Sequence, residues 1–139
     1  MSLETQLEII LSQTDGRPMY QQIMVQIKNK ITLGDWSQGH KLPSIREMAA
    51  AAKVSVITVK RAYQELENEG IIVTQQGKGS FINEIDNLSI ILKEQEMNKN
   101  LNKAIDIAIS IAMSTSELQI RLDKLQDLKR PINGENNND

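Results

Sequence analysis

Two helix starts lie close together in this chain, and they constrain its fold more than any other feature. The first is Leu42-Pro-Ser-Ile-Arg-Glu-Met, in which Ser44 and Glu47 have the spacing of a capping box. The second is at Ser55, a favoured N-cap residue, and predicts a helix over residues 55–69. The expected buried face of this second helix is Val59, Ala62, Tyr63 and Leu66. A connection of only two residues favours two helices crossing at an angle over an antiparallel hairpin.

The first turn of the second helix has the chemistry of a helix that reads DNA. It holds Val56, Ile57 and Thr58 with no acidic residue, and Lys60 and Arg61 follow. The positive end of the helix dipole therefore lacks a neutralising carboxylate, which suits phosphates or the acceptors of a groove. At least one of the two apolar side chains is expected to be exposed, where it can contact a thymine methyl group. We interpret the pair of helices as a helix-turn-helix.

The segments on either side of this motif have clear patterns of their own. The N-terminal residues 1–15 form an apolar arm of undefined structure, ending in a turn before Pro18. An amphipathic helix is expected from Pro18 to about Leu33, and Trp36 is expected to pack the following loop onto the core. After the second helix, β-prone runs within residues 71–83 flank the tip Gln76-Gly-Lys-Gly and predict a hairpin. The apolar face of the amphipathic helix is Tyr20, Ile23, Met24, Ile27 and Ile31.

The C-terminal third predicts two helices with unpaired apolar stripes. A long helical pattern runs from about Asp86 to Ala112, and Ser114 with Glu117 forms a capping box for a helix to about Lys129. These stripes must pack on the rest of the chain, on each other or on a second copy, and a homodimer is the simplest solution. The residues expected to form the dimer interface are Leu101, Ile105, Ala108, Ile109, Leu118, Leu122 and Leu125. The tail at 131–139, rich in Asn and Asp, is expected to be disordered.

Composition excludes several classes of function. The chain has no cysteine and a single histidine, which leaves no thiolate or histidine-pair metal site and no common catalytic triad. No metal, cofactor or enzymatic activity is therefore expected. No apolar run approaches the length of a membrane span and no leader-like pattern opens the chain, so the expectation is a cytoplasmic protein without a membrane partner.

Charge is distributed unevenly along the chain. The net charge is −2, but residues 16–82 contain nine Lys or Arg against five Asp or Glu. The flanking segments 1–15 and 83–139 are each acidic, with a net charge of −3. The positive charge is therefore concentrated in the segment that contains the helix-turn-helix, as expected of a nucleic-acid-binding part.

A set of colinear motifs from residue 17 to about 83, roughly half of the chain, resembles the winged helix-turn-helix of the GntR family of bacterial transcription regulators. The motifs are Pro18-Met-Tyr-Gln-Gln-Ile, Gly34 and Gly39, Leu42-Pro-Ser-Ile-Arg-Glu-Met-Ala, Val54-Ser-Val-Ile-Thr-Val-Lys-Arg-Ala-Tyr, Leu66-Glu-Asn-Glu-Gly-Ile-Ile and Gly77-Lys-Gly-Ser-Phe-Ile. The short helical tail resembles that of the YtrA subgroup, which implies a brief dimerisation region rather than a large effector domain. Effector identity stays unknown.

This resemblance implies which residues contact DNA. The hairpin becomes the wing, whose glycines allow close approach to DNA while Lys78 supplies a charge. The implied DNA-contacting residues are Ser44, Arg46, Ser55, Val56, Thr58, Lys60, Arg61, Gly77, Lys78 and Gly79. Two positions depart from the family pattern: Val56 replaces an arginine found in some members, and Lys53 replaces a common glycine of the turn. Other roles stay open, because Ser55 can be only a cap, Thr58 a surface residue and Arg61 an intramolecular partner.

The expected architecture is mainly α with a small β-hairpin. It comprises an arm (1–15), a winged helix-turn-helix DNA-binding domain (16–84), a helical dimerisation region (85–130) and a tail (131–139). The expected function is sequence-specific binding of an inverted-repeat operator by a homodimer, acting as a repressor rather than an activator. The alternative is a winged-helix module that binds protein without binding DNA.

Overall fold

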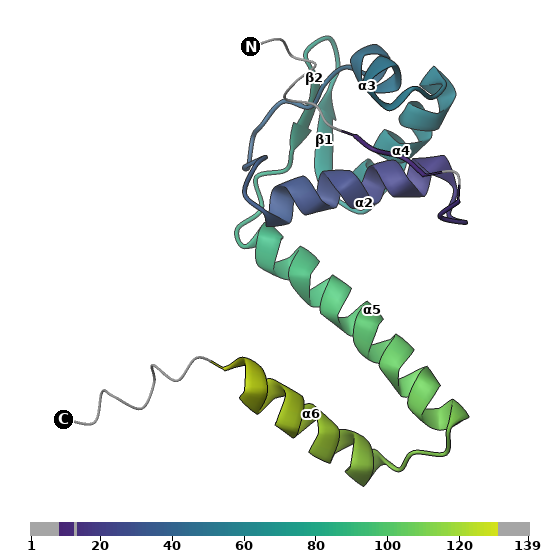
Figure 1. Ribbon diagram of the computed structural model, residues 1–139. Coiled ribbons are helices and arrows are strands. Elements are labelled where there is room, and N and C mark those ends of the chain that lie inside the picture. The colour runs from purple at the N-terminus through teal and green to yellow at the C-terminus, as the bar shows by residue number, and fades with distance from the viewer. Residues whose placement is uncertain (1–8, 13, 131–139) are drawn as a thin grey trace, which may run out of the picture. The chain divides into compact units, whose positions relative to one another are not determined.

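The computed structural model describes residues 9–12 and 14–130, and it confirms a mainly helical fold with a β-hairpin. The chain divides into two compact units that meet between Glu94 and Gln95. The elements in chain order are α2 (Met19–Thr32), α3 (Ile45–Ala52), α4 (Val56–Asn68), β1 (Ile72–Gln75), β2 (Gly79–Ile82), α5 (Leu88–Ser110) and α6 (Thr115–Lys129) (Figure 1).

Three helices begin at the serines that the sequence indicates. The Ser44 hydroxyl accepts a hydrogen bond from the Glu47 amide at 3.1 Å, and α3 starts at the next residue. The Ser55 hydroxyl accepts from the Thr58 amide at 3.2 Å and caps α4. Ser114 caps α6 in the same way. Each cap satisfies an amide that has no partner within its helix, which fixes the helix start.

The core of the first unit is built from the apolar stripes of α2, α3 and α4, closed on one side by the hairpin. All four residues of the predicted α4 stripe are buried, and Trp36 is 7% exposed, which confirms that it packs its loop onto the core. Leu88 and Leu92 of α5 belong to the same core. The first unit therefore includes the first turns of α5 and extends past residue 84, where the sequence places the domain boundary. The largest fully buried side chains are Ile23, Ile27, Met48, Leu66, Ile72, Ile82 and Val59.

The hairpin has a third extended segment beside it that the sequence does not predict. Strands β1 and β2 pair antiparallel, with Ile72 opposite Ile82 and Gln75 opposite Gly79. Lys41 forms an antiparallel bridge with Phe81, flanked by backbone hydrogen bonds on both sides. The loop before α3 is thereby fixed to the outer edge of the wing.

A buried glutamine anchors the N-terminal arm on α2. Gln22 is 3% exposed; its side-chain oxygen accepts from the Ser12 amide at 2.8 Å, and its nitrogen donates to the carbonyls of Ser12 and Arg17. Ile9 is buried in the core. Residues 9–12 of the arm thus contact α2, whereas residues 1–8 of the predicted arm lie outside the described residues.

The turn between α3 and α4 requires a left-handed residue, and this residue is Lys53. Its φ and ψ are 57° and 46°. Replacing a side chain by glycine at such a position relieves about 1 kcal/mol of strain and adds about 0.5 kcal/mol of unfolded-state entropy. We therefore expect Lys53→Gly to raise the free energy of unfolding by roughly 0.5 kcal/mol, measured by denaturant titration. Lys53→Ala retains the Cβ and should give no gain; equal stabilisation by both variants would contradict a backbone origin.

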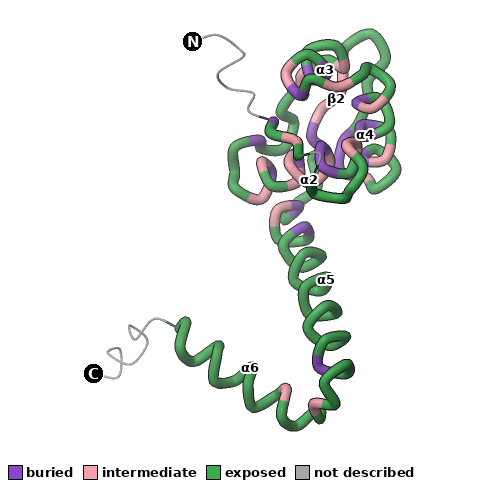
Figure 2. Tube along the Cα trace, turned by 45° about the vertical axis from the view of Figure 1, so that its right-hand side comes forward, coloured by how far each residue is buried: buried purple, intermediate pink, exposed green. Residues whose placement is uncertain are grey.

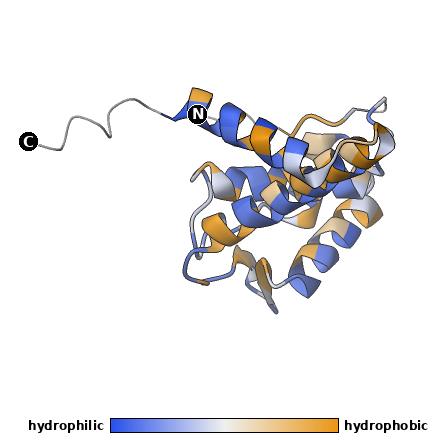
Figure 3. Ribbon diagram, turned by 90° about the horizontal axis from the view of Figure 1, so that it is seen from below, coloured by the Kyte–Doolittle hydropathy of each residue, from blue (hydrophilic) through white to orange (hydrophobic). Residues whose placement is uncertain are grey.

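The second unit consists of the later turns of α5 together with α6, and most of its residues are exposed (Figure 2). Hydrophobic segments recur among hydrophilic ones along α6 (Figure 3). Within the described ranges, no helix combines the length and apolarity needed to cross a membrane.

Candidate nucleic-acid interface

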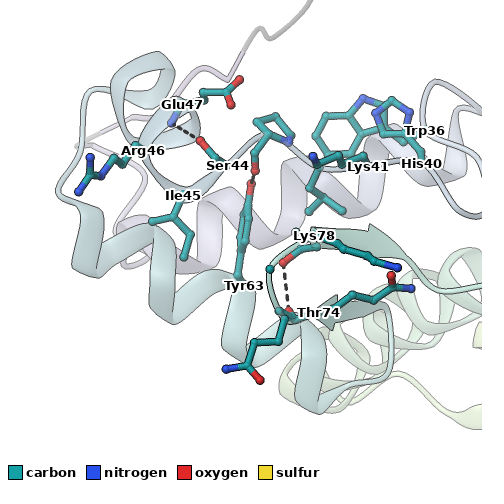
Figure 4. A pocket seen from close by; sticks show the side chains of 17 residues that line it. Trp36, His40, Lys41, Ser44, Ile45, Arg46, Glu47, Tyr63, Thr74 and Lys78 are labelled. Carbon is teal, nitrogen blue, oxygen red and sulfur yellow. Dashed lines mark hydrogen bonds between the residues drawn. The ribbon is translucent and has the colours of Figure 1, made fainter.

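A cleft of about 840 Å³ separates the start of α3 from the wing, and we call it the α3–wing cleft (Figure 4). Its walls come from the segment before α3, the first turn of α3, one residue of α4 and the wing tip. The lining residues are Trp36, His40, Lys41, Leu42, Pro43, Ser44, Ile45, Arg46, Glu47, Tyr63, Thr74, Gln75, Gln76, Gly77, Lys78, Gly79 and Ser80.

Tyr63 holds one wall of the α3–wing cleft in place. Its hydroxyl donates to the Pro43 carbonyl at 2.7 Å, which ties the residue before the α3 cap to the buried face of α4 (Figure 4). Burial raises the pKa of Tyr63, and the nearby Glu47 carboxylate adds to the shift. The phenol is therefore protonated at neutral pH and available as a hydrogen-bond donor.

The charge of the α3–wing cleft comes from lysine and arginine. Lys41, Arg46 and Lys78 line it with a single carboxylate, Glu47. Lys41, Arg46 and Lys78 are exposed, and within residues 9–12 and 14–130 none of the three forms a salt bridge. Burial lowers the pKa of His40, which stacks on Trp36 with ring centroids 5.1 Å apart, so this imidazole is neutral at pH 7. Three cations therefore face one carboxylate in the lining, which leaves the cleft basic and suited to phosphate groups.

The first turn of α4 presents the surface expected of a recognition helix. Val56 is 47% and Ile57 is 79% exposed, and the turn contains no acidic residue. The hydroxyls of Ser55 and Thr58 are 2.8 Å apart and hydrogen-bonded to each other. Both residues therefore complete the helix cap, whatever further contact they make. Lys60 is exposed.

Arg61 contacts a residue of its own chain, which is one of the roles that the sequence leaves open for it. Its guanidinium carbon lies 4.0 Å from the centroid of the Tyr20 ring, and one guanidinium nitrogen donates to the Tyr20 hydroxyl at 3.3 Å. A cation over an aromatic face is attracted by the ring quadrupole. This contact joins α4 to α2 and fixes the direction of the Arg61 side chain.

The two glycines of the wing tip have different surroundings. At Gly77, where φ is +80°, a Cβ would meet no atom within 4 Å. At Gly79, where φ is +121°, a Cβ would lie 2.9 Å from Cε of Lys41. An external partner can therefore approach the backbone closely at Gly77, whereas Lys41 occupies the space beside Gly79.

The residues predicted for the dimer interface are mostly exposed in the single chain. Leu101, Ile105 and Ile109 of α5 are 39%, 42% and 70% exposed. Leu122 and Leu125 of α6 are about half exposed, and Leu118 is partly buried. Ala108 differs, because it is 5% exposed and already buried by its own chain.

Helices α2 and α3 packed on α4, a hairpin wing, a basic cleft between α3 and the wing, and an exposed first turn of α4 together define a winged helix-turn-helix DNA-binding protein. Residues 19–82 match the model of the bacterial regulatory proteins of the gntR family. The HTH-type transcriptional repressor YtrA of Bacillus subtilis (strain 168) is 34% identical over 122 residues, covering 88% of this chain and 92% of that protein. The chain therefore belongs to the GntR family of bacterial transcription regulators.

Solved structures agree with this assignment. A GntR family transcriptional regulator from Listeria monocytogenes superposes with a TM-score of 0.68 at 29% identity, over 79% of this chain and 96% of that one. AraR(DBD) in complex with operator ORX1 superposes with a TM-score of 0.51 at 26% identity, over 54% of this chain and 95% of that one. The first likeness extends past the winged helix-turn-helix, whereas the second covers about half of the chain.

Proposed function

We propose that this regulator represses transcription by binding an inverted-repeat operator as a homodimer in the cytoplasm, without catalytic activity of its own. The observation that carries the proposal is the pairing of an acid-free, exposed first turn of α4 with the three cations that line the α3–wing cleft. A helix of this kind reads base edges, while lysines and arginines beside it bind phosphates. Repression is supported by the relative from Bacillus subtilis, whose name describes a repressor.

Each DNA-contacting residue has a distinct expected role. Val56 and Ile57 are placed to contact thymine methyl groups, and Lys60 to contact a base edge or phosphate. Arg46 extends the surface from α3, and the wing tip at Gly77 and Lys78 lies on the DNA backbone. Ser44, Ser55 and Thr58 add hydroxyls near the helix N-termini. Arg61 contributes by its contact with the Tyr20 ring, which joins α4 to α2. Gly79 contributes by leaving space for the Lys41 side chain.

Dimerisation is proposed for the helical region 85–130, with residues 16–84 carrying the DNA contacts. The exposed leucines and isoleucines of α5 and α6 are the apolar surface that a second copy would cover. A two-fold axis would then place two α4 helices on two half-sites, which matches the symmetry of an inverted repeat.

Selection of duplexes from a random pool, at a stated salt concentration, tests this function. The expected product is an inverted repeat whose halves are separated by about one helical turn or a multiple of it. Recovery of sequences without symmetry would contradict the dimer, and failure to enrich any duplex would favour the alternative of a protein-binding winged helix.

Lys78→Ala tests contact between the wing and the DNA backbone. If Lys78 binds a phosphate, the variant should weaken binding to operator and unrelated duplexes alike. The negative slope of log affinity against log salt should become shallower by about one unit per protomer. The measurement is a salt titration of binding. An unchanged slope would place the wing tip away from the backbone.

A further inference from the structure

Lys41 reaches the wing tip through a notch that Gly79 creates. Its backbone is held by the bridge to Phe81, at the outer edge of β2. Its side chain then runs past Gly79, so closely that a Cβ there would lie 2.9 Å from Cε and 3.7 Å from Nζ of Lys41. A side chain at residue 79 would therefore displace the end of the lysine stem from the position it has here.

The path of the Lys41 side chain affects the rotamer entropy that this residue loses when it binds a partner. A free lysine side chain loses rotamer entropy amounting to about 1.5–2 kcal/mol when it is fixed. Here the strand pairing fixes the backbone of Lys41, and the Gly79 backbone flanks the distal part of its stem. A stem with restricted rotamers in the free chain has less entropy left to lose on binding.

The ammonium group of Lys41 has no anionic partner among the residues that the structure describes. Lys41 is exposed, and no salt bridge to it occurs within the described ranges. It lines the same cleft as Lys78 and Arg46, between the start of α3 and the wing. Figure 4 shows Lys41 on the wall before α3 and Lys78 on the wing side.

We propose that Lys41 binds a phosphodiester of the DNA backbone, as a further contact residue that works with Lys78 in the α3–wing cleft. This inference rests on the proposed DNA-binding function and adds a residue from outside the helix-turn-helix. The Lys41 stem lies against Gly79, next to Lys78 in the chain, so the two lysines can bind one stretch of backbone together. Such contacts orient the wing on DNA without reading sequence. Gly79 contributes by leaving the notch open.

The test separates the charge of Lys41 from its packing. Lys41→Met retains an unbranched stem beside Gly79 and removes the charge, whereas Lys41→Arg retains the charge. Lys124→Met, at an exposed position of α6, is the matched control for loss of one lysine. Each variant is studied as the full chain, by salt titration of binding to the selected operator duplex and to an unrelated duplex, with thermal unfolding measured alongside.

Lys41→Met is expected to make the negative slope of log affinity against log salt shallower by about 0.9 unit per protomer. It should also weaken binding to both duplexes by a similar factor. Lys41→Arg should keep the wild-type slope, and Lys124→Met should do the same. A wild-type slope for Lys41→Met, or a loss of slope in Lys41→Arg equal to that of Lys41→Met, would overturn the phosphate contact and leave Lys41 with a packing role. If the wild-type chain itself shows no salt-dependent duplex binding, the proposed DNA-binding function fails, and this inference fails with it.

Discussion

Ile105→Asp is expected to turn the dimer into monomers and to lower operator affinity by about 100-fold or more. Ile105 is 42% exposed in the single chain, so the carboxylate can be hydrated in a folded monomer. At a helix–helix interface the same carboxylate would be buried, at a cost of several kcal/mol, and the two-fold axis would introduce it twice. Loss of the dimer also removes the gain from linking two DNA-binding modules, which is about 10²–10⁴ in affinity.

The control for this variant lies two residues earlier on the same helix. Lys103→Gln changes the net charge by the same single unit, but residue 103 is on the opposite side of α5 from the apolar stripe. Analytical ultracentrifugation gives the oligomeric state, and titration with the selected operator gives the affinity. A dimeric Ile105→Asp chain would show that α5 does not form the interface through this stripe, and monomers from both variants would point to charge rather than packing.

Arg46→Ala is expected to reduce operator affinity by roughly 10- to 100-fold for each half-site, the loss typical of an arginine that contacts bases or phosphates. The Arg46 side chain is exposed and has no salt bridge in the described part of the chain, so its removal should leave the unfolding temperature unchanged. The structure places it in the first turn of α3, next to the Ser44 cap, where it lines the α3–wing cleft (Figure 4).

Comparison of operator and unrelated duplexes distinguishes the two roles of Arg46. A base contact predicts a large loss on the operator and a small loss elsewhere, whereas a phosphate contact predicts equal losses and a lower salt slope. Arg121→Ala on α6, also an exposed arginine, serves as the control and should bind as the wild type does. Wild-type affinity of Arg46→Ala for the operator would remove α3 from the DNA-binding surface.

Much of the fold could be predicted because its signals are local. The starts of α3, α4 and α6 depend on one hydroxyl and an amide three residues later, and this spacing is visible in the sequence. The buried stripe of α4 follows from helical periodicity. Lys53 has a left-handed conformation at the position where the family commonly has glycine. The hairpin is indicated by glycines between two β-prone runs.

The candidate site was predictable in part, for the same reason. Local motifs indicate the helix N-termini and the wing tip, and the first turn of α4 is exposed as they predict. Pairing between distant segments was not predictable: the contact of Arg61 with Tyr20 joins residues 41 positions apart, and that of Tyr63 with Pro43 joins residues 20 apart. No periodicity or cap links such partners in a sequence.

The sequence by itself determined the family, the order and caps of the helices, and the concentration of positive charge in residues 16–82. The tertiary structure alone decided that Lys41 passes through the notch at Gly79, that Gln22 holds the arm on α2, and that Leu88 and Leu92 belong to the core of the first unit. The physical reason is that a cap or a stripe depends on the covalent neighbours of a residue. A notch, a buried polar contact and a shared core instead depend on which segments, far apart in the sequence, pack together and exclude water.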